Sequence, residues 1–131
     1  MTEALPLHIQ GSELLTGSFD SWPRFHDSEV LELVLKRDPK PTAILRVTAF
    51  RTSSELDDAG FYKKINECVV AIEFEDINEL RVEDFNEQNV LAEIFFATTS
   101  VGFEVLLAGL YGIHASFKCK NVRVLSVTYK T

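Results

Sequence analysis

The chain has 131 residues, of which 46% are hydrophobic and 25% are charged. Domains usually hold about 100–200 residues, so we expect a single domain spanning residues 1–131. This composition is typical of globular proteins and excludes a disordered or low-complexity chain. The net charge of −7 argues against nucleic acid as a partner, because sequence-independent binding to nucleic acid needs clustered cations.

Acidic residues concentrate in the middle of the sequence. Residues 1–54 carry seven acids and six bases, residues 55–93 carry twelve acids and three bases, and residues 94–131 carry one acid and four bases. The middle segment therefore holds a charge of −9. A regional charge of this kind steers an oppositely charged partner, and it also keeps a surface solvated. Both interpretations stay open at this point.

The N-terminal residues and the cysteines indicate a cytoplasmic protein. The first 15 residues lack a basic segment followed by an apolar run, as a secretory signal would have. No segment approaches the roughly 20 apolar residues that span a bilayer, so we expect no membrane association. Cys68 and Cys119 each lie in an apolar run, where a thiol behaves as a small buried hydrophobe.

Apolar residues alternate with period two along most of the chain, which predicts half-buried strands. A strand is expected over 28–36 and another over 42–50, joined by a turn at the prolines of 38–41. The apolar faces of these two strands are expected to be Leu31, Leu33 and Leu35 in the first, and Ala43, Leu45, Val47 and Ala49 in the second.

Residues 51–66 are polar and are interrupted by Gly60, which predicts a long connection with at most a short helical turn. Loops of this length are often functional. Further strands are expected over 68–75, 77–83, 91–98, 103–107, 116–119 and 122–129, with helix as an alternative near residues 85–97. The sequence thus predicts a mainly β fold, or α+β with little helix: a single antiparallel β-sandwich or open barrel of about eight short strands.

The adjacent His26 and Asp27 are the strongest candidates for catalysis. Metal-dependent phosphohydrolases use such a pair, but they need further ligands, and neither His8 nor His114 lies at a recognisable ligand spacing. We favour a structural role, in which short polar side chains satisfy the backbone of a turn. A small metal-dependent hydrolase using His26 and Asp27 remains an alternative.

Other catalytic motifs are missing from the sequence. There is no nucleophile elbow, phosphate-binding glycine loop or calcium-binding loop. We therefore expect no enzymatic activity, no cofactor and no metal, and we keep a small-ligand-binding β-barrel as a second alternative. Aromatic residues beside acidic ones make good interaction anchors, although most of the aromatic residues are expected in the core.

Four stretches, 18–35, 53–62, 69–91 and 110–127, together resemble the immunity protein 50 family. The most specific element is a Trp-Pro-x-Phe-His-Asp-x-Glu-Val motif, and two shorter elements follow it. Position 28 is Ser where a small residue such as Ala is expected, and Ile-His at 113–114 departs from the family's usual loop. The matching residues are Trp22, Pro23, Phe25, His26, Asp27, Glu29 and Val30, then Phe85, Asn86 and Asn89, and finally Tyr111 and Gly112.

Members of this family are small bacterial proteins that protect a cell from a polymorphic toxin. The resemblance implies binding to a cognate toxin, for which a basic nuclease is one candidate, by a monomer or weak homodimer. It implies structural roles for the motif residues, whereas the acidic segment supplies candidates for a surface complementary to the toxin. These candidates are Asp57, Asp58, Glu75, Asp76, Glu79, Glu83, Asp84 and Glu87.

Overall fold

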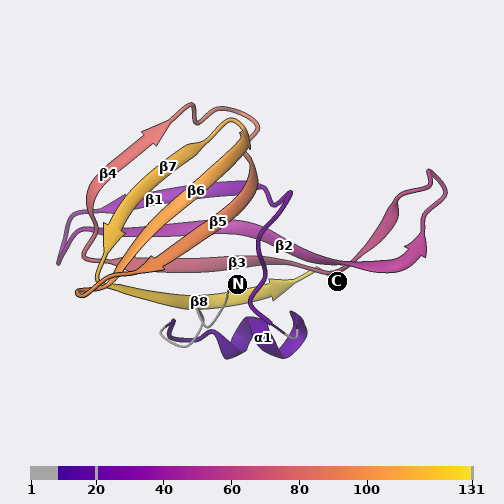
Figure 1. Ribbon diagram of the computed structural model, residues 1–131, viewed down its shortest axis with the longest axis horizontal. Coiled ribbons are helices and arrows are strands. Elements are labelled where there is room, and N and C mark those ends of the chain that lie inside the picture. The colour runs from indigo at the N-terminus through magenta and orange to yellow at the C-terminus, as the bar shows by residue number, and fades with distance from the viewer. Residues whose placement is uncertain (1–8, 20, 131) are drawn as a thin grey trace.

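The computed structural model describes residues 9–19 and 21–130, which form one short helix and eight strands (Figure 1). The strands make two four-stranded antiparallel sheets, with the orders β1-β2-β3-β8 and β4-β7-β6-β5, and neither closes into a barrel. This confirms the predicted mainly β fold. The elements are α1 (Glu13–Phe19), β1 (Val30–Lys36), β2 (Thr42–Leu56), β3 (Tyr62–Glu75), β4 (Asn78–Glu83), β5 (Val90–Thr98), β6 (Phe103–Tyr111), β7 (His114–Cys119) and β8 (Asn121–Tyr129).

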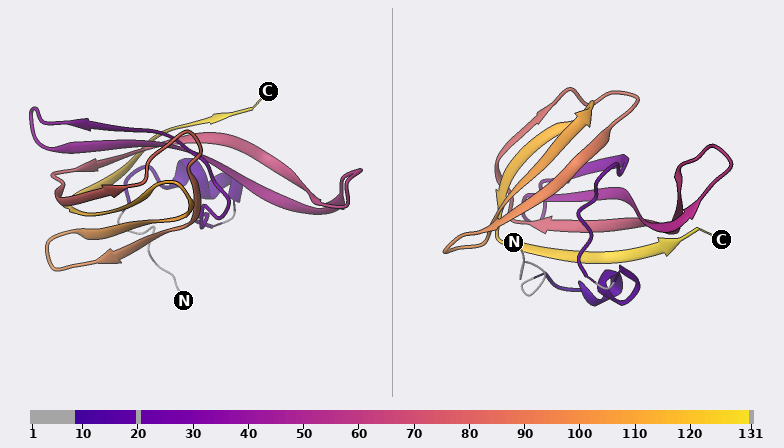
Figure 2. Two further views of the ribbon diagram at one scale, coloured as in Figure 1. Left: turned by 90° about the horizontal axis from the view of Figure 1, so that it is seen from above. Right: turned by 45° about the vertical axis from the view of Figure 1, so that its right-hand side comes forward.

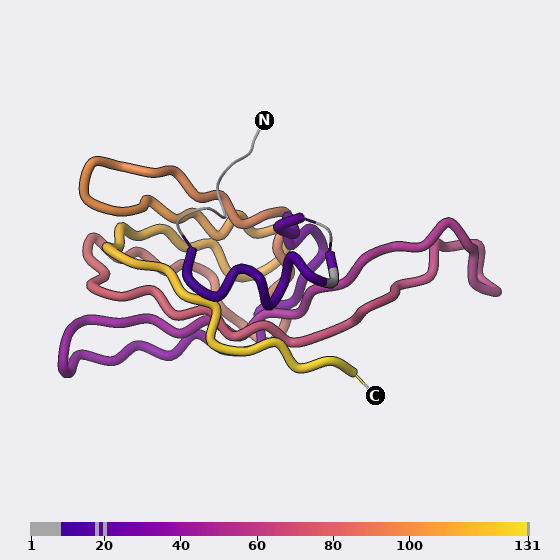
Figure 3. Tube along the Cα trace, turned by 90° about the horizontal axis from the view of Figure 1, so that it is seen from below, coloured from indigo at the N-terminus to yellow at the C-terminus, as the bar shows by residue number. Residues whose placement is uncertain are grey.

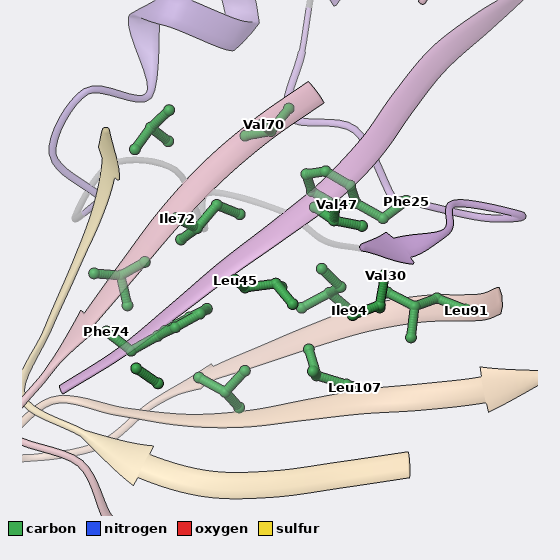
Figure 4. Close-up of a cluster of buried hydrophobic side chains, with 14 of the residues drawn as sticks. Phe25, Val30, Leu45, Val47, Val70, Ile72, Phe74, Leu91, Ile94 and Leu107 are labelled. Carbon is green, nitrogen blue, oxygen red and sulfur yellow. The ribbon is translucent and has the colours of Figure 1, made fainter. Parts of the chain in front are cut away.

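The core lies between the two sheets, whose strands cross at an oblique angle (Figures 1 and 2). Alternate residues of β2 and β3, including Leu45 and Phe74, are fully buried, as the period-two pattern predicts. They face Leu107 of β6 and Ile94 of β5 (Figure 4). The ring of Phe74 meets the ring of Phe117 edge-on, with 4.9 Å between centroids. The two inner faces therefore interdigitate as they do in a sandwich.

Helix α1 lies beside β8 and is absent from the sequence-based expectations (Figure 2). It buries Leu15 and Phe19, four residues apart on one face. Seven residues with two buried positions give too short a pattern to identify a helix. Within residues 9–19 and 21–130, no helix is long and apolar enough to cross a membrane.

The expected long connection over 51–66 is wrong. Strands β2 and β3 continue through it, with Arg51 opposite Ile65 and Leu56 opposite Tyr62. They form a two-stranded arm that projects from the sandwich (Figures 1 and 3). Water reaches both faces of the arm, so its residues lack the apolar alternation that marks a half-buried strand. The helix alternative near residues 85–97 is also wrong, because Val90–Thr98 is β5.

The expected apolar face of β1 is only partly buried. Leu33 packs against the core, but Leu31 and Leu35 are exposed. A bulge between Val30 and Glu32 changes the phase of the strand and buries Val30. Leu35 lies opposite Ala43, next to the turn at the far end of the edge strand.

Candidate functional site

Residues 24–30, which contain the histidine-aspartate pair, join the two sheets. The Leu91 N–H donates to the Ser28 carbonyl oxygen at 2.8 Å, and the Val30 N–H donates to the Asn89 carbonyl oxygen at 2.8 Å. On the other side, the Thr48 N–H donates to the Glu29 carbonyl oxygen at 3.0 Å. The segment therefore connects the start of β5 in one sheet to β2 in the other.

Two residues of this segment have left-handed backbone conformations. Phe25 has a φ of 64° and Asp27 a φ of 62°, in a region that costs most non-glycine residues roughly 1–2 kcal/mol. The Phe25 ring is buried and lies edge-on to Trp22, whereas the Asp27 N–H donates to the Leu91 carbonyl oxygen at 2.9 Å. Packing and backbone hydrogen bonds thus hold both residues in strained conformations.

Asn89 connects the two shorter motif elements to this segment. Its buried amide oxygen accepts hydrogen bonds from the N–H groups of Asn86 and Ile113, each at 3.0 Å. Its amide nitrogen donates to the Asn86 carbonyl oxygen at 2.7 Å. Gly112 has a φ of 73°, and a Cβ there would clash with the Gln88 carbonyl oxygen. The three motif elements therefore meet in one place, which we call the sheet junction: residues 22–30, 85–91 and 111–113.

Replacing Asp27 with alanine is expected to lower the free energy of unfolding by about 1 kcal/mol, because alanine lacks the local hydrogen bonding that makes Asp tolerant of positive φ. Asp27→Gly should retain the wild-type value within about 0.5 kcal/mol, since glycine adopts this conformation freely. Chemical denaturation checks both values. Equal destabilisation by glycine and alanine would show that the exposed carboxylate matters and the backbone conformation does not.

The geometry does not favour the metal-hydrolase alternative. His26 and Asp27 are exposed, with 3.6 Å between Nε2 and Oδ2, and His26 Nδ1 donates to the Ala92 carbonyl oxygen at 2.9 Å. Within the part of the chain that the structure describes, no three His, Cys, Asp or Glu side chains gather where they could hold a metal ion. His114 accepts a 3.5 Å hydrogen bond from the Gly109 N–H, and His8 lies outside the described residues.

The two cysteines are free and buried. Burial raises the pKa of Cys68 and raises the pKa of Cys119 to about 12. Both side chains therefore stay protonated at neutral pH, whereas a nucleophile or a zinc ligand has to be a thiolate. This agrees with their expected role as small core residues.

A hollow of about 760 Å³ lies on the outward face of the β4-β7-β6-β5 sheet. Phe95 and Leu106 line it together with Arg81 and Lys118, and Lys118 forms an ion pair with Glu79 at 3.2 Å. The hollow opens to solvent and mixes charged with apolar side chains. A small-ligand-binding barrel would have an enclosed apolar cavity inside a closed sheet, so neither the sheets nor this hollow fit that alternative.

The eight acidic candidates fall into three groups. Asp57 and Asp58 lie at the tip of the arm, far from the sandwich (Figure 1). The second group lies where β3 turns into β4. The third lies at the end of β4 and in the following loop, and its last member falls within the sheet junction. All are exposed except Glu75, which is half-buried. The second group is Glu75, Asp76 and Glu79, and the third is Glu83, Asp84 and Glu87.

Most aromatic residues were expected in the core, and several of them are exposed. Phe61 and Tyr62 beside the arm tip are 71% and 61% exposed, and Tyr111 at the sheet junction is 65% exposed. Phe25 and Phe117 are buried as expected. Sequence composition alone does not separate these groups, because exposure depends on which strand segments the opposite sheet covers.

Comparison with known protein families identifies the family of this chain. A family model described as immunity protein 50 matches residues 11–130, which include the arm, the acidic segment and the sheet junction. The chain belongs to the immunity protein 50 family. Comparisons with curated proteins and with solved structures gave no match.

Membership of the immunity protein 50 family makes this chain an immunity protein of a polymorphic toxin system, which neutralises a toxin by binding and has no enzymatic activity. The match confirms the resemblance given by the Trp-Pro-x-Phe-His-Asp-x-Glu-Val motif. The motif residues lie in the sheet junction, where backbone hydrogen bonds and the buried amide of Asn89 join the segments. Half of the motif side chains, among them His26, Phe85 and Tyr111, are exposed. A surface for the toxin therefore has to be sought among the exposed residues.

Proposed function

We propose that this immunity protein 50 member inactivates its cognate toxin by direct one-to-one binding through its acidic surface. The observation that carries the proposal is the family match over residues 11–130. The charge of −9 over residues 55–93 supports the acidic mechanism. A toxin that acts on nucleic acid needs a cationic cleft, and complementary charge speeds association and rejects wrong partners.

The proposed toxin-facing residues are the eight acidic candidates of the three groups. Two of them are already engaged within the protein, because Asp57 accepts hydrogen bonds in the arm tip and Glu79 pairs with Lys118. The carboxylates of Glu83, Asp84 and Glu87 make no hydrogen bond or ion pair with residues 9–19 or 21–130. The carboxylates of Asp58, Glu75 and Asp76 likewise have no such partner among the described residues. Glu83, Asp84 and Glu87 lie close together in the chain, so one triple variant changes all three.

The proposed site of action is the cytoplasm, and the free chain is proposed to be a monomer or a weak homodimer. The two free cysteines support this compartment, because disulfides are rare where glutathione keeps thiols reduced. A basic nuclease is the proposed class of toxin.

Reversing Glu83, Asp84 and Glu87 together to lysine is expected to slow association with the toxin about tenfold or more at low salt. The effect should shrink as salt rises, because salt screens interactions between exposed charges. Stopped-flow or surface plasmon resonance measurements over a series of salt concentrations check this.

A control that is matched in charge reverses Glu32, Asp38 and Glu104, three exposed acids outside the middle segment, of which Glu32 pairs with Arg46 and Asp38 with Arg37. Either triple reversal changes the net charge from −7 to −1, because three negative charges become three positive ones. An equal fall in the association rate in both variants would show that only the total charge matters. Unchanged affinity and salt dependence in the first variant would reject the acidic surface.

A further inference from the structure

The arm consists of residues 51–66, where β2 and β3 pair only with each other among the strands that the structure describes. Strand β1 reaches along β2 only as far as Val47, and β8 reaches along β3 only to Cys68. The pairing of β2 with β3 continues to Leu56 and Tyr62. Among the residues that the structure describes, no further strand therefore pairs with either outer edge of the arm (Figures 1 and 3).

The tip of the arm has a defined conformation. The Asp57 N–H donates to the Phe61 carbonyl oxygen at 2.7 Å. The Asp57 side chain also accepts hydrogen bonds: its Oδ1 is 2.9 Å from the Ala59 N–H nitrogen and 3.0 Å from the Phe61 N–H nitrogen. Gly60 supplies the left-handed residue of the turn, with a φ of 86°. A tip held in this way loses less conformational entropy when it binds than a flexible loop would.

Large apolar side chains on the arm contribute nothing to the core. Leu56 is 56% exposed, Phe61 and Tyr62 are exposed still more, and Ile65 is also exposed. An isolated two-stranded ribbon is only marginally stable in water. Adjacent exposed aromatic and aliphatic residues commonly mark an interaction site, and aromatic side chains are common anchors in protein interfaces.

We propose that the arm tip inserts into a concave, apolar cleft of the toxin that has a cationic rim. Leu56, Phe61 and Tyr62 fill the cleft, and Asp58 pairs with a cation at its rim. This inference rests on the proposed direct binding and names the part of the surface that carries most of the affinity. A projecting hairpin carries exposed side chains all around its tip. A cleft would contact most of these side chains, whereas a flat surface would contact only a few of them.

Charge supports a cationic partner over a second copy of this chain. The tip, residues 55–62, contains three acids and no base, whereas the bases of the arm, Arg51, Lys63 and Lys64, lie nearer to the sandwich and balance the charge of the whole arm. Glu55 pairs with Lys63 at 3.6 Å, whereas Asp58 has no hydrogen bond or ion pair to any described residue. Two such tips brought together would repel each other, and a cationic rim would instead attract the free carboxylate.

The test compares the full chain with the Phe61→Ala/Tyr62→Ala double variant. The dissociation constant for the toxin is expected to rise about 100-fold or more, mainly through faster dissociation, as for other aromatic anchors. The melting temperature should stay the same, because both side chains are mostly exposed. Phe95→Ala/Val101→Ala is the matched control, since these exposed side chains lie on β5 and in the β5–β6 turn, away from the arm.

Hydrogen exchange of the wild-type chain gives a second readout that does not depend on a variant folding. Amides of residues 51–66 should exchange more slowly when the toxin is bound. Toxin binding by the double variant within threefold of wild type, or arm exchange that the toxin leaves unchanged, would reject the inference while leaving the proposed function intact. Failure of the wild-type chain to bind the toxin would reject the proposed function itself. A concentration-dependent dimer that the double variant loses would assign the arm to a second copy and overturn the proposal.

Discussion

Replacing Asn89 with alanine is expected to lower the free energy of unfolding by about 2–4 kcal/mol. The substitution removes a buried amide and leaves the N–H groups of Asn86 and Ile113 without their acceptor. Ile113 is fully buried, so water does not readily replace the lost acceptor. Urea denaturation followed by tryptophan fluorescence measures the change, because Trp22 is the only tryptophan and belongs to the junction.

Asn121→Ala is the control for this variant, because Asn121 is exposed at the start of β8. This substitution should lower the free energy of unfolding by less than about 0.5 kcal/mol. A similarly small cost for Asn89→Ala would contradict the view that the junction motifs hold the two sheets together.

Phe74→Ala is expected to cost about 3–5 kcal/mol of stability. Phe74 is fully buried between the sheets, and its ring lies near the rings of Phe117 and Phe96, with 4.9 Å and 6.4 Å between centroids. Truncation leaves a cavity that the two interdigitated sheets fill only in part. Calorimetry or denaturant titration measures the loss.

Phe61→Ala is the matched comparison for Phe74→Ala, because it makes the same chemical change at an exposed site. It should lower stability by less than about 1 kcal/mol while weakening toxin binding. Equal destabilisation at the two positions would contradict the assignment of Phe74 to the core and of Phe61 to the binding surface.

The inner faces of β2 and β3 could be predicted from the sequence because they are half-buried and alternate strictly. Val47 and Val70, for example, have polar or less buried neighbours, and both are fully buried. The arm could not be predicted in this way. Among the described residues its strands pair only with each other, and residues 54–65 are exposed on both faces, so no period marks them.

The role of the sheet junction could be predicted only in part. The Trp-Pro-x-Phe-His-Asp-x-Glu-Val motif suggested a turn that precedes a strand, and the structure places such a turn at residues 26–27. The contact of Asn89 with Ile113 joins residues 24 positions apart, and no local pattern indicates it. Likewise, the acidic candidates could be named from the sequence, but their separation into three groups depends on the path of the chain.

We propose that the sheet junction and the arm have different roles, the first in folding and the second in toxin binding. Backbone hydrogen bonds and the buried amide of Asn89 stabilise the junction, whose changes should act on folding. The arm adds little to the core, so changes at Phe61, Tyr62 and Asp58 should act on binding. In the β4–β5 loop, Asp84 lies next to the junction and Glu87 within it, at the end of the sandwich from which the arm projects (Figure 1).

The most direct test of inhibition by binding is to titrate this protein into the toxin encoded by the neighbouring gene. Toxin activity and the heat of binding are both measured during the titration. Direct inhibition predicts that toxin activity falls in proportion to the added protein and reaches its minimum at a one-to-one ratio, where the heat of binding also saturates. Inactivation of many toxin molecules by each molecule of this protein, or full toxin activity at a saturating ratio with no heat of binding, would contradict it.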